Sequence, residues 1–173
     1  MDFDAIVAKY EKPVYNLIYR LIGDRDEAAD LTQDTFVAAF RSMSDFRGDA
    51  SVYTWLYRIA VNKCKNAFKE RDRRRARVGP GLDADLEAEL VRGPSDAFEP
   101  DAVLERKELR ERIERAIAQL PPDYRIVAVL RDLHGLSYEE IARTADLSID
   151  VVRTRIARAR ALLRQKLEHY LVE

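Results

Sequence analysis

The chain has 173 residues, of which 47% are hydrophobic and 35% are charged, a composition that suits one domain or two small helical domains. Its single cysteine, Cys64, excludes an intramolecular disulfide framework and is consistent with a reducing cytoplasm. Because no apolar run reaches about 18 residues and the N-terminus lacks the pattern of a secretory signal, we expect a cytoplasmic protein without membrane insertion.

The formal net charge of −1 conceals an uneven distribution of charge along the chain. Residues 57–75 carry eight basic and two acidic side chains, a net charge of +6, and residues 148–166 carry six and one, a net charge of +5. Residues 76–104 carry seven acidic and two basic side chains, a net charge of −5. Any function assigned to the chain must explain two basic stripes separated by an acidic spacer.

In the first half of the chain, the spacing of apolar residues predicts three helices. They are expected over residues 4–21, about 24–43 and about 52–75, and Asp24 and Asp26 are both suited to cap the second. A polar turn is expected at 45–51, before the third helix.

The stretch 76–104 contains three of the six glycines and three of the six prolines, and the helical period fades within it. This composition predicts a flexible acidic linker. Helical periodicity resumes beyond the linker, and no strand pattern stands out. We therefore expect an all-α fold made of two helical bundle domains, at 1–75 and 105–173.

In the second half, the apolar period predicts a helix over 101–119, which Pro121 and Pro122 stop. The next helix is expected to be capped by Asp123 and to end near Leu133.

Residues 136–167 have the features of a helix-turn-helix. Ser137 and Glu140 form the sequence pattern of a capping box, which begins a short helix. The segment 144–147 is short enough for a tight turn, and Ser148 is suited to cap a second, longer helix. In a helix-turn-helix, the second helix enters the DNA major groove.

The side chains of this second helix divide into an apolar back and a polar front. Helical spacing places Arg153, Thr154 and Arg158 on the front, where arginine forks can pair with guanine, and it directs Arg155, Arg160 and Arg164 toward the flanking phosphates. Two alternatives are a solvated basic helix within a bundle and a membrane-surface helix. The second is disfavoured because the apolar face lacks Trp and Phe.

Aromatic and basic side chains lie together at residues 45–75. Phe46, Tyr53, Trp55 and Tyr57 surround the predicted turn, and a stripe follows with Arg58, Asn62, Lys65 and Lys69. Aromatic rings beside a cationic track are typical of proteins that bind single-stranded DNA. For Trp55 and Tyr53 a core role and a stacking role both remain open, whereas Phe46, in a polar loop, favours function.

The predicted helix at 24–43 carries a third candidate surface. Its polar side includes Asp30, Gln33, Asp34, Val37 and Arg41, opposite Phe36 and Phe40. This side is either an ordinary solvated face or a docking surface for helices of another protein.

Two long strings of the sequence resemble the extracytoplasmic-function (group 4) sigma factors of bacterial RNA polymerase. They are DLTQDTFVAAFRSMSDFRGDASVYTWLYRIAVNKCKN, from residue 30, and LPPDYRIVAVLRDLHGLSYEEIARTADLSIDVVRTRIARAR, from residue 120. The resemblance implies a sigma-2 domain at 1–75, an acidic linker at 76–104 and a sigma-4 domain at 105–173.

The resemblance also implies roles for the three surfaces. It assigns binding of the polymerase clamp helices to the polar side of the 24–43 helix, through Asp30, Gln33, Asp34, Val37 and Arg41. It assigns binding and melting of the −10 element to Phe46, Asp49, Ser51, Arg58, Asn62, Lys63 and Asn66, and binding of the −35 element to Ser148, Arg153, Thr154, Arg155 and Arg158.

The partners implied are core RNA polymerase (the clamp helices of beta-prime and the flap of beta), promoter DNA and an anti-sigma factor. The protein is expected in the cytoplasm, with the nucleoid when active and tethered to the membrane only through an anti-sigma factor. The sequence offers no nucleophile–base set and no metal-ligand cluster, so we expect no enzymatic activity, no cofactor and no metal. The entry to the recognition helix, SIDV at 148–151, departs from the family's usual Pro/Gly-Thr-Val type and implies a shifted −35 preference.

Three other classes of protein are weighed against this resemblance. A stand-alone dimeric helix-turn-helix repressor would bind DNA tightly without polymerase, and the linker and aromatic loop speak against it. A nucleic-acid enzyme would need a catalytic constellation. A helical adaptor that binds only proteins would show no salt-dependent affinity for DNA.

Overall fold

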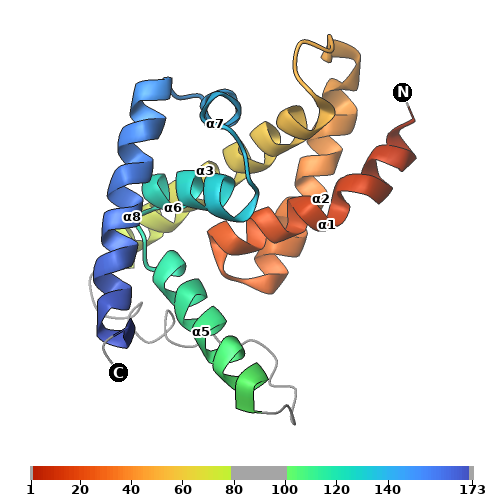
Figure 1. The fold of residues 1–173 in the computed structure, drawn as a ribbon. Coiled ribbons are helices and arrows are strands. Elements are labelled where there is room, and N and C mark those ends of the chain that lie inside the picture. Colours follow the sequence, from red (N-terminus) through yellow and green to blue (C-terminus); the bar gives the residue numbers. More distant parts are fainter. Residues whose placement is uncertain (1, 79–100, 172–173) are drawn as a thin grey trace.

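The computed structural model describes residues 2–78 and 101–171, and within these ranges every regular element is helical (Figure 1). The all-α prediction is therefore confirmed, whereas 79–100, most of the predicted linker, lies outside the described residues. The elements are α1 (Phe3–Ile22), α2 (Arg25–Ser42), the short 3₁₀ turn η1 (Met43–Asp45), α3 (Val52–Val78), α5 (Asp101–Ala118), α6 (Pro122–Ala128), the π-helical turn η2 (Val129–Leu133), α7 (Tyr138–Ala145) and α8 (Ile149–Leu171).

Helices α1, α2 and α3 form the first module. Gly23 ends α1 with φ of +83°, a left-handed conformation that glycine adopts without a steric penalty. Asp24 follows at once and, of the two predicted caps Asp24 and Asp26, is the one that caps α2, because its carboxylate accepts a 2.7 Å hydrogen bond from the Glu27 backbone N–H. This short connection lets α1 and α2 pack closely, and α3 covers both. The fully buried side chains include Val14, Leu17, Ile18, Leu21, Leu56, Val61 and Cys64.

Helices α5 to α8 form the second module, whose interior holds Leu120, Val127, Leu130, Ile141, Val152 and Ile156. Pro121 and Pro122 follow the end of α5, as predicted. The prediction that Asp123 caps α6 is wrong, because α6 begins at Pro122 and the residue before it, Pro121, makes no side-chain cap. Proline is favoured at the first helical position because the missing N–H would have no partner there.

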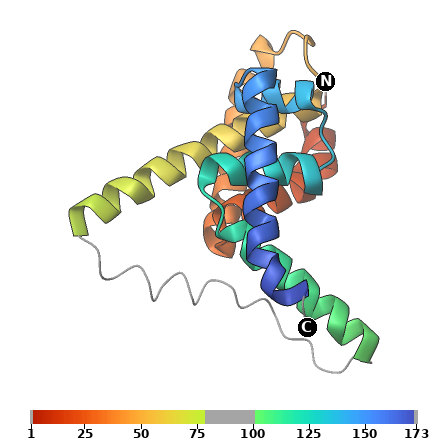
Figure 2. The same ribbon diagram turned by 60° about the vertical axis from the view of Figure 1, so that its left-hand side comes forward.

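The two modules pack directly against each other. Helix α7 of the second module lies against α3 of the first, while the outer ends of α3 and α5 project away from the body (Figures 1 and 2). The guanidinium of Arg125 donates a 2.7 Å hydrogen bond to the Leu21 carbonyl, and Arg20 forms a 2.6 Å salt bridge with Glu114. Most of the buried apolar residues of both modules form one continuous cluster, and Leu120, Ala128 and Ala159 form a smaller one.

At the centre of this contact, Tyr57 of α3 meets His134, which follows η2. The Tyr57 side chain is fully buried, and its hydroxyl lies 2.8 Å from Nδ1 of His134. Burial, with a smaller contribution from the nearby Arg20 charge, lowers the pKa of His134 below its ordinary value of 6.5. The imidazole is therefore neutral at pH 7, which suits a hydrogen bond with a buried phenol.

The lowered pKa of His134 predicts a pH dependence of stability. The unfolded chain takes up a proton at His134 near pH 6.5, whereas the folded chain resists it until a lower pH. The contribution of His134 is thus complete above about pH 6.5 and declines as the pH falls through that value and toward the folded pKa. We expect the free energy of unfolding, measured in urea between pH 7.5 and 5, to decrease less in His134→Gln than in the wild type. A His169→Gln variant controls for the loss of an imidazole, and equal slopes for wild type and His134→Gln would contradict the prediction.

Candidate nucleic-acid and protein interfaces

The turn between α7 and α8 has the geometry of a helix-turn-helix. The capping box is present, since the Ser137 hydroxyl accepts from the Glu140 N–H at 3.1 Å and the Glu140 carboxylate accepts from the Ser137 N–H at 2.8 Å. Asp146 ends α7 in a left-handed conformation with φ of +57°, and the Ser148 hydroxyl caps α8 by accepting from the Val151 N–H at 3.3 Å. These caps confirm the predicted helix-turn-helix and orient α8 across α7.

Helix α8 has a buried back and an exposed front, as its sequence predicts. Val152, Ile156 and Ala159 are buried. The predicted −35 residues Ser148, Arg153, Thr154 and Arg158 are exposed, and Arg155 is half-buried. Three of the arginines have partners on the protein, in the pairs Arg153–Asp150 at 3.5 Å, Arg155–Asp123 at 3.8 Å and Arg158–Tyr124 hydroxyl at 3.3 Å. Arg160, expected to face phosphates, is ion-paired with Asp132 at 2.9 Å.

On α3 the structure divides the predicted basic stripe. Arg58, Asn62 and Asn66 are exposed, and Lys63 is half-buried. Lys65 instead turns toward the second module, where its ammonium donates a 2.6 Å hydrogen bond to the Ala145 carbonyl, and burial lowers its pKa. Of the four predicted −10 residues on this helix, three are therefore fully accessible to a ligand, and Lys63 is partly accessible.

The loop before α3 brings Phe46 onto Trp55. Their ring centroids are 4.8 Å apart, and both side chains are half-buried. Asp49 and Ser51 are exposed, and the Ser51 hydroxyl accepts from the Thr54 N–H at 3.1 Å, which fixes the start of α3. The aromatic pair thus lies at the edge of the first module, and each of the two side chains is partly packed and partly accessible to solvent.

The other aromatic residues of this region belong to the packing between modules. Tyr57 is fully buried, and the ring of the half-buried Tyr53 lies 4.0 Å from it, centroid to centroid. Only the tertiary structure separates these two rings from the Phe46–Trp55 pair, because all four lie within one short segment of the sequence.

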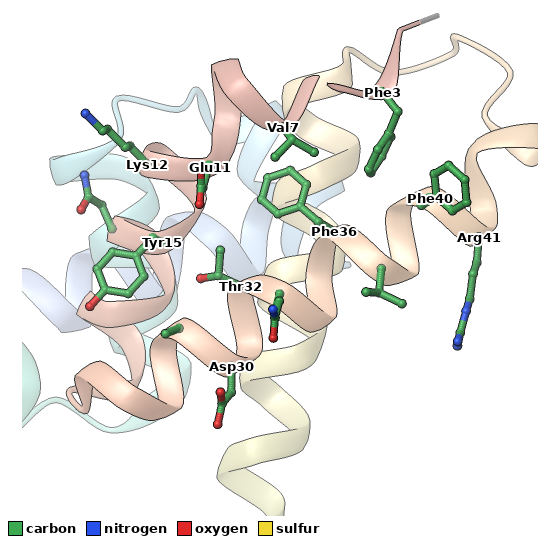
Figure 3. A pocket seen from close by; sticks show the side chains of 14 residues that line it. Phe3, Val7, Glu11, Lys12, Tyr15, Asp30, Thr32, Phe36, Phe40 and Arg41 are labelled. Atoms are coloured by element: carbon green, nitrogen blue, oxygen red, sulfur yellow. The ribbon is translucent and has the colours of Figure 1, made fainter. Parts of the chain in front are cut away.

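A groove of about 980 Å³ runs between α1 and α2 (Figure 3). Asp30, Gln33, Val37 and Arg41 line it, as does Phe40. Asp34 is exposed on the same helix without lining the groove.

Phe36 and Phe40 depart from the sequence-based expectation, which places both on the side opposite the polar face, because both line the groove. The larger departure is that of Phe40. It is 59% exposed and packs edge-on against Phe3, with centroids 5.1 Å apart. From α1, the groove also takes Phe3, Val7 and Tyr15, which sequence reasoning missed. These three residues recur at helical spacing on α1, in addition to the apolar residues that form its core face. This surplus of apolar positions was the signal available in the sequence.

Among residues 2–78 and 101–171, no group of His, Cys, Asp and Glu side chains is placed to hold a metal ion. Within the same described ranges, no helix combines the length and the apolar character needed to cross a membrane.

Comparisons with known proteins agree with this geometry. Residues 6–74 match the family model for Sigma-70 region 2, and residues 110–163 match that for Sigma-70, region 4. The RNA polymerase sigma-H factor of Pseudomonas aeruginosa is 39% identical over 175 residues, covering 99% of this chain and 89% of that protein. The ECF RNA polymerase sigma-E factor of Escherichia coli K12 is 39% identical over 170 residues, covering 96% of this chain and 86% of that protein.

Two solved structures share the fold. The sigma factor RpoE of Bartonella quintana, in complex with the anti-sigma factor NepR, has a TM-score of 0.73 and 21% identity, covering 96% of this chain and 97% of that one. CnrH, in complex with the cytosolic domain of CnrY, has a TM-score of 0.66 and 26% identity, covering 96% and 88%. The folds and surfaces define a sigma-70 family protein with regions 2 and 4. The chain belongs to the extracytoplasmic-function sigma factors within that family.

Proposed function

We propose that this sigma factor guides core RNA polymerase to promoters by reading duplex −35 DNA with α8 and trapping unpaired −10 DNA with the loop before α3 and the exposed face of α3. The observation that carries the proposal is the pairing of two unlike surfaces in one chain. One is a capped helix-turn-helix with an exposed arginine front, and the other is an aromatic pair beside exposed Arg58 and Asn62. The corresponding domains are 1–75 and 105–173, with 76–104 between them.

The direct test of this proposal adds the purified chain to core polymerase. We expect RNA synthesis to start at defined sites, and to require both proteins. A gel shift with and without core polymerase separates this function from a stand-alone repressor, which would bind promoter DNA tightly by itself. Random starts that the chain does not change would refute the proposal.

The −10 surface needs no covalent chemistry to favour melting. Unstacking a base costs a few kcal/mol, and stacking on an aromatic ring returns about 1–3 kcal/mol. Phe46 and Trp55 already lie 4.8 Å apart, so part of the ordering cost of such a site is met before DNA arrives. Asp49 and Ser51 in the same loop and Arg58, Asn62, Lys63 and Asn66 on α3 are the proposed polar contacts.

Phe46→Ala is expected to impair promoter opening and to leave closed-complex binding nearly unchanged. The loss of one stacked base corresponds to about 1–3 kcal/mol in the opening equilibrium. Permanganate reactivity of −10 thymines reports opening, and a gel shift at low temperature reports the closed complex. Phe40→Ala, which removes an exposed phenylalanine elsewhere in the module, is the matched control for opening once holoenzyme has formed. Wild-type permanganate reactivity in Phe46→Ala would exclude the stacking role.

The groove between α1 and α2 is the proposed docking site for the polymerase clamp helices. Its apolar floor is rimmed by charged side chains of both signs, which suits an amphipathic helix that carries acidic and basic side chains beside its apolar face. The rim consists of Glu11, Lys12, Asp30, Gln33 and Arg41, with Asp34 nearby. The flap of the beta subunit is the second proposed polymerase contact, with the domain at 105–173.

Val37→Glu is expected to weaken binding of core polymerase at least tenfold. Val37 is 46% exposed in the groove, so docking of the apolar face of a helix would bury the new carboxylate without a partner, which is costly. Affinity is measured by competition for core polymerase against fluorescently labelled wild-type chain. Val78→Glu, at the exposed and distant end of α3, provides the control for an added surface charge. Equal affinities for Val37→Glu and the wild type would remove the groove from the interface.

A promoter requires the two modules to separate. Elements named −35 and −10 lie roughly 25 base pairs apart, or about 85 Å along B-form DNA. A compact body of about 150 residues is only roughly 40 Å across. The 22 residues from 79 to 100 could span up to roughly 70 Å if extended. We therefore infer that the packed arrangement opens when polymerase binds.

This opening can be followed by energy transfer between dyes at engineered Ser44→Cys and Arg164→Cys, both exposed positions in different modules. The native Cys64 is fully buried, and burial raises the pKa of its thiol to about 12, so it should not compete for the dyes. We expect high transfer efficiency in the free chain and low efficiency after core polymerase is added. An unchanged efficiency on formation of active holoenzyme would contradict the separation.

We also propose that an anti-sigma factor controls this chain in the cytoplasm. The support is that both structural relatives were solved with a bound polypeptide, the anti-sigma factor NepR in one and the cytosolic domain of CnrY in the other. No cofactor and no enzymatic activity are part of the proposal. Nucleoid association when active, and membrane tethering only through the anti-sigma factor, follow from it.

A further inference from the structure

A hollow of about 670 Å³ lies between the start of α6 and the front of α8. Thr154, Arg155 and Arg158, three of the predicted −35 residues, form one wall. Asp123 and Tyr124 of α6 form the other. The surface that faces −35 DNA in the proposed function is therefore built by two helices, and α6 contributes side chains that the sequence pattern of a recognition helix does not include.

Tyr124 is well placed to hold a neighbouring side chain. Its ring is half-buried and packs against the cluster of Leu120, Ala128 and Ala159, which joins α6 to α8. Its hydroxyl reaches the hollow and accepts a 3.3 Å hydrogen bond from Nη1 of Arg158. The exposed guanidinium is thus tied to a group that the core fixes in place.

The hydrogen bond leaves Arg158 able to read a base. A guanidinium has five N–H donors, and the bond to Tyr124 uses one of them. The others can still form the two parallel hydrogen bonds that arginine makes with guanine O6 and N7. A free arginine on a helix surface loses much rotamer entropy when it binds, so restraint before binding favours the correct contact.

We propose that Tyr124 is a positioning residue that orients Arg158 and thereby increases selectivity for one part of the −35 element. The proposal rests on the proposed function, in which Arg158 reads a base edge. Asp123 differs, because it pairs with Arg155 at 3.8 Å, and that arginine is directed to the phosphate flank. Loss of a phosphate contact weakens binding to all sequences about equally, whereas a disturbed base contact lowers selectivity at one position.

The test uses holoenzyme and a library of linear templates with randomised −35 and −10 segments, each carrying a transcribed barcode. Sequencing of the RNA products gives the base preference at every position. The proteins compared are the wild type, Tyr124→Phe, Arg158→Ala, the double variant and Asp123→Asn. Tyr124→Phe keeps the packed ring and removes only the hydroxyl, so its thermal unfolding should match the wild type.

We expect Arg158→Ala to abolish the preference at one or two −35 positions. Tyr124→Phe should reduce the preference at the same positions by roughly twofold to tenfold, the range for loss of one hydrogen bond. In the double variant, the loss of the hydroxyl should have no further effect. Asp123→Asn should change the total RNA yield with little change in base preference.

Three results would overturn the proposal while leaving base reading by Arg158 intact. They are an unchanged preference in Tyr124→Phe, an equal effect of Tyr124→Phe when Arg158 is already alanine, and an effect of Asp123→Asn at the same positions and of the same size. If Arg158→Ala itself leaves every −35 preference unchanged, the base-reading role fails and Tyr124 has no contact to position. If the wild-type chain gives no defined starts, the proposed function itself is refuted.

Discussion

The architecture depends on the burial of one apolar stripe along α3. Leu56, Ala60, Val61 and Cys64 are fully buried, and Phe68 nearly so, at the spacing of a single helical face. Helices α1 and α2 cover this stripe on one side, and α7 and α6 approach it from the other module. Because those contacts occupy one side of α3, Arg58, Asn62 and Asn66 are left exposed on the opposite side, the side that carries the proposed −10 contacts.

The basic residues have two kinds of role, which their charge alone does not distinguish. Some are structural: Arg71 binds the Ile22 carbonyl and Glu27, Lys65 binds the Ala145 carbonyl, and Arg125 binds the Leu21 carbonyl. Others, such as Arg58 and Arg153, lie on exposed faces. Part of a positive stripe in the sequence therefore forms structural contacts between helices. The number of arginines in the sequence overstates the number that are available to bind phosphates.

The interface between modules combines specific polar contacts with a continuous apolar core. The Tyr57–His134 and Arg20–Glu114 pairs and the Lys65 and Arg125 hydrogen bonds to main-chain carbonyls fix its geometry. A typical intramolecular hydrogen bond contributes only about 1 kcal/mol in net terms. Such contacts are individually weak, so a partner that binds the separated modules better can shift the equilibrium by its difference in affinity for the two states. Both proposed DNA surfaces are exposed while the modules are packed together. The contact between the modules therefore does not cover these surfaces, but it limits the distance between them.

The sequence by itself determined the local structure and the family. Helical periods, the Asp24 and Ser148 caps and the Ser137–Glu140 capping box depend on residues within a few positions of one another, and short-range geometry decides them. Only the tertiary structure decided which aromatic rings are core, that Phe40 faces a groove shared with α1, that Lys65 turns away from its stripe and that Tyr124 reaches Arg158. The partners in these contacts come from other helices, 34 residues away for Tyr124 and Arg158 and 80 for Lys65 and Ala145, and no local pattern records which distant surface a side chain will meet.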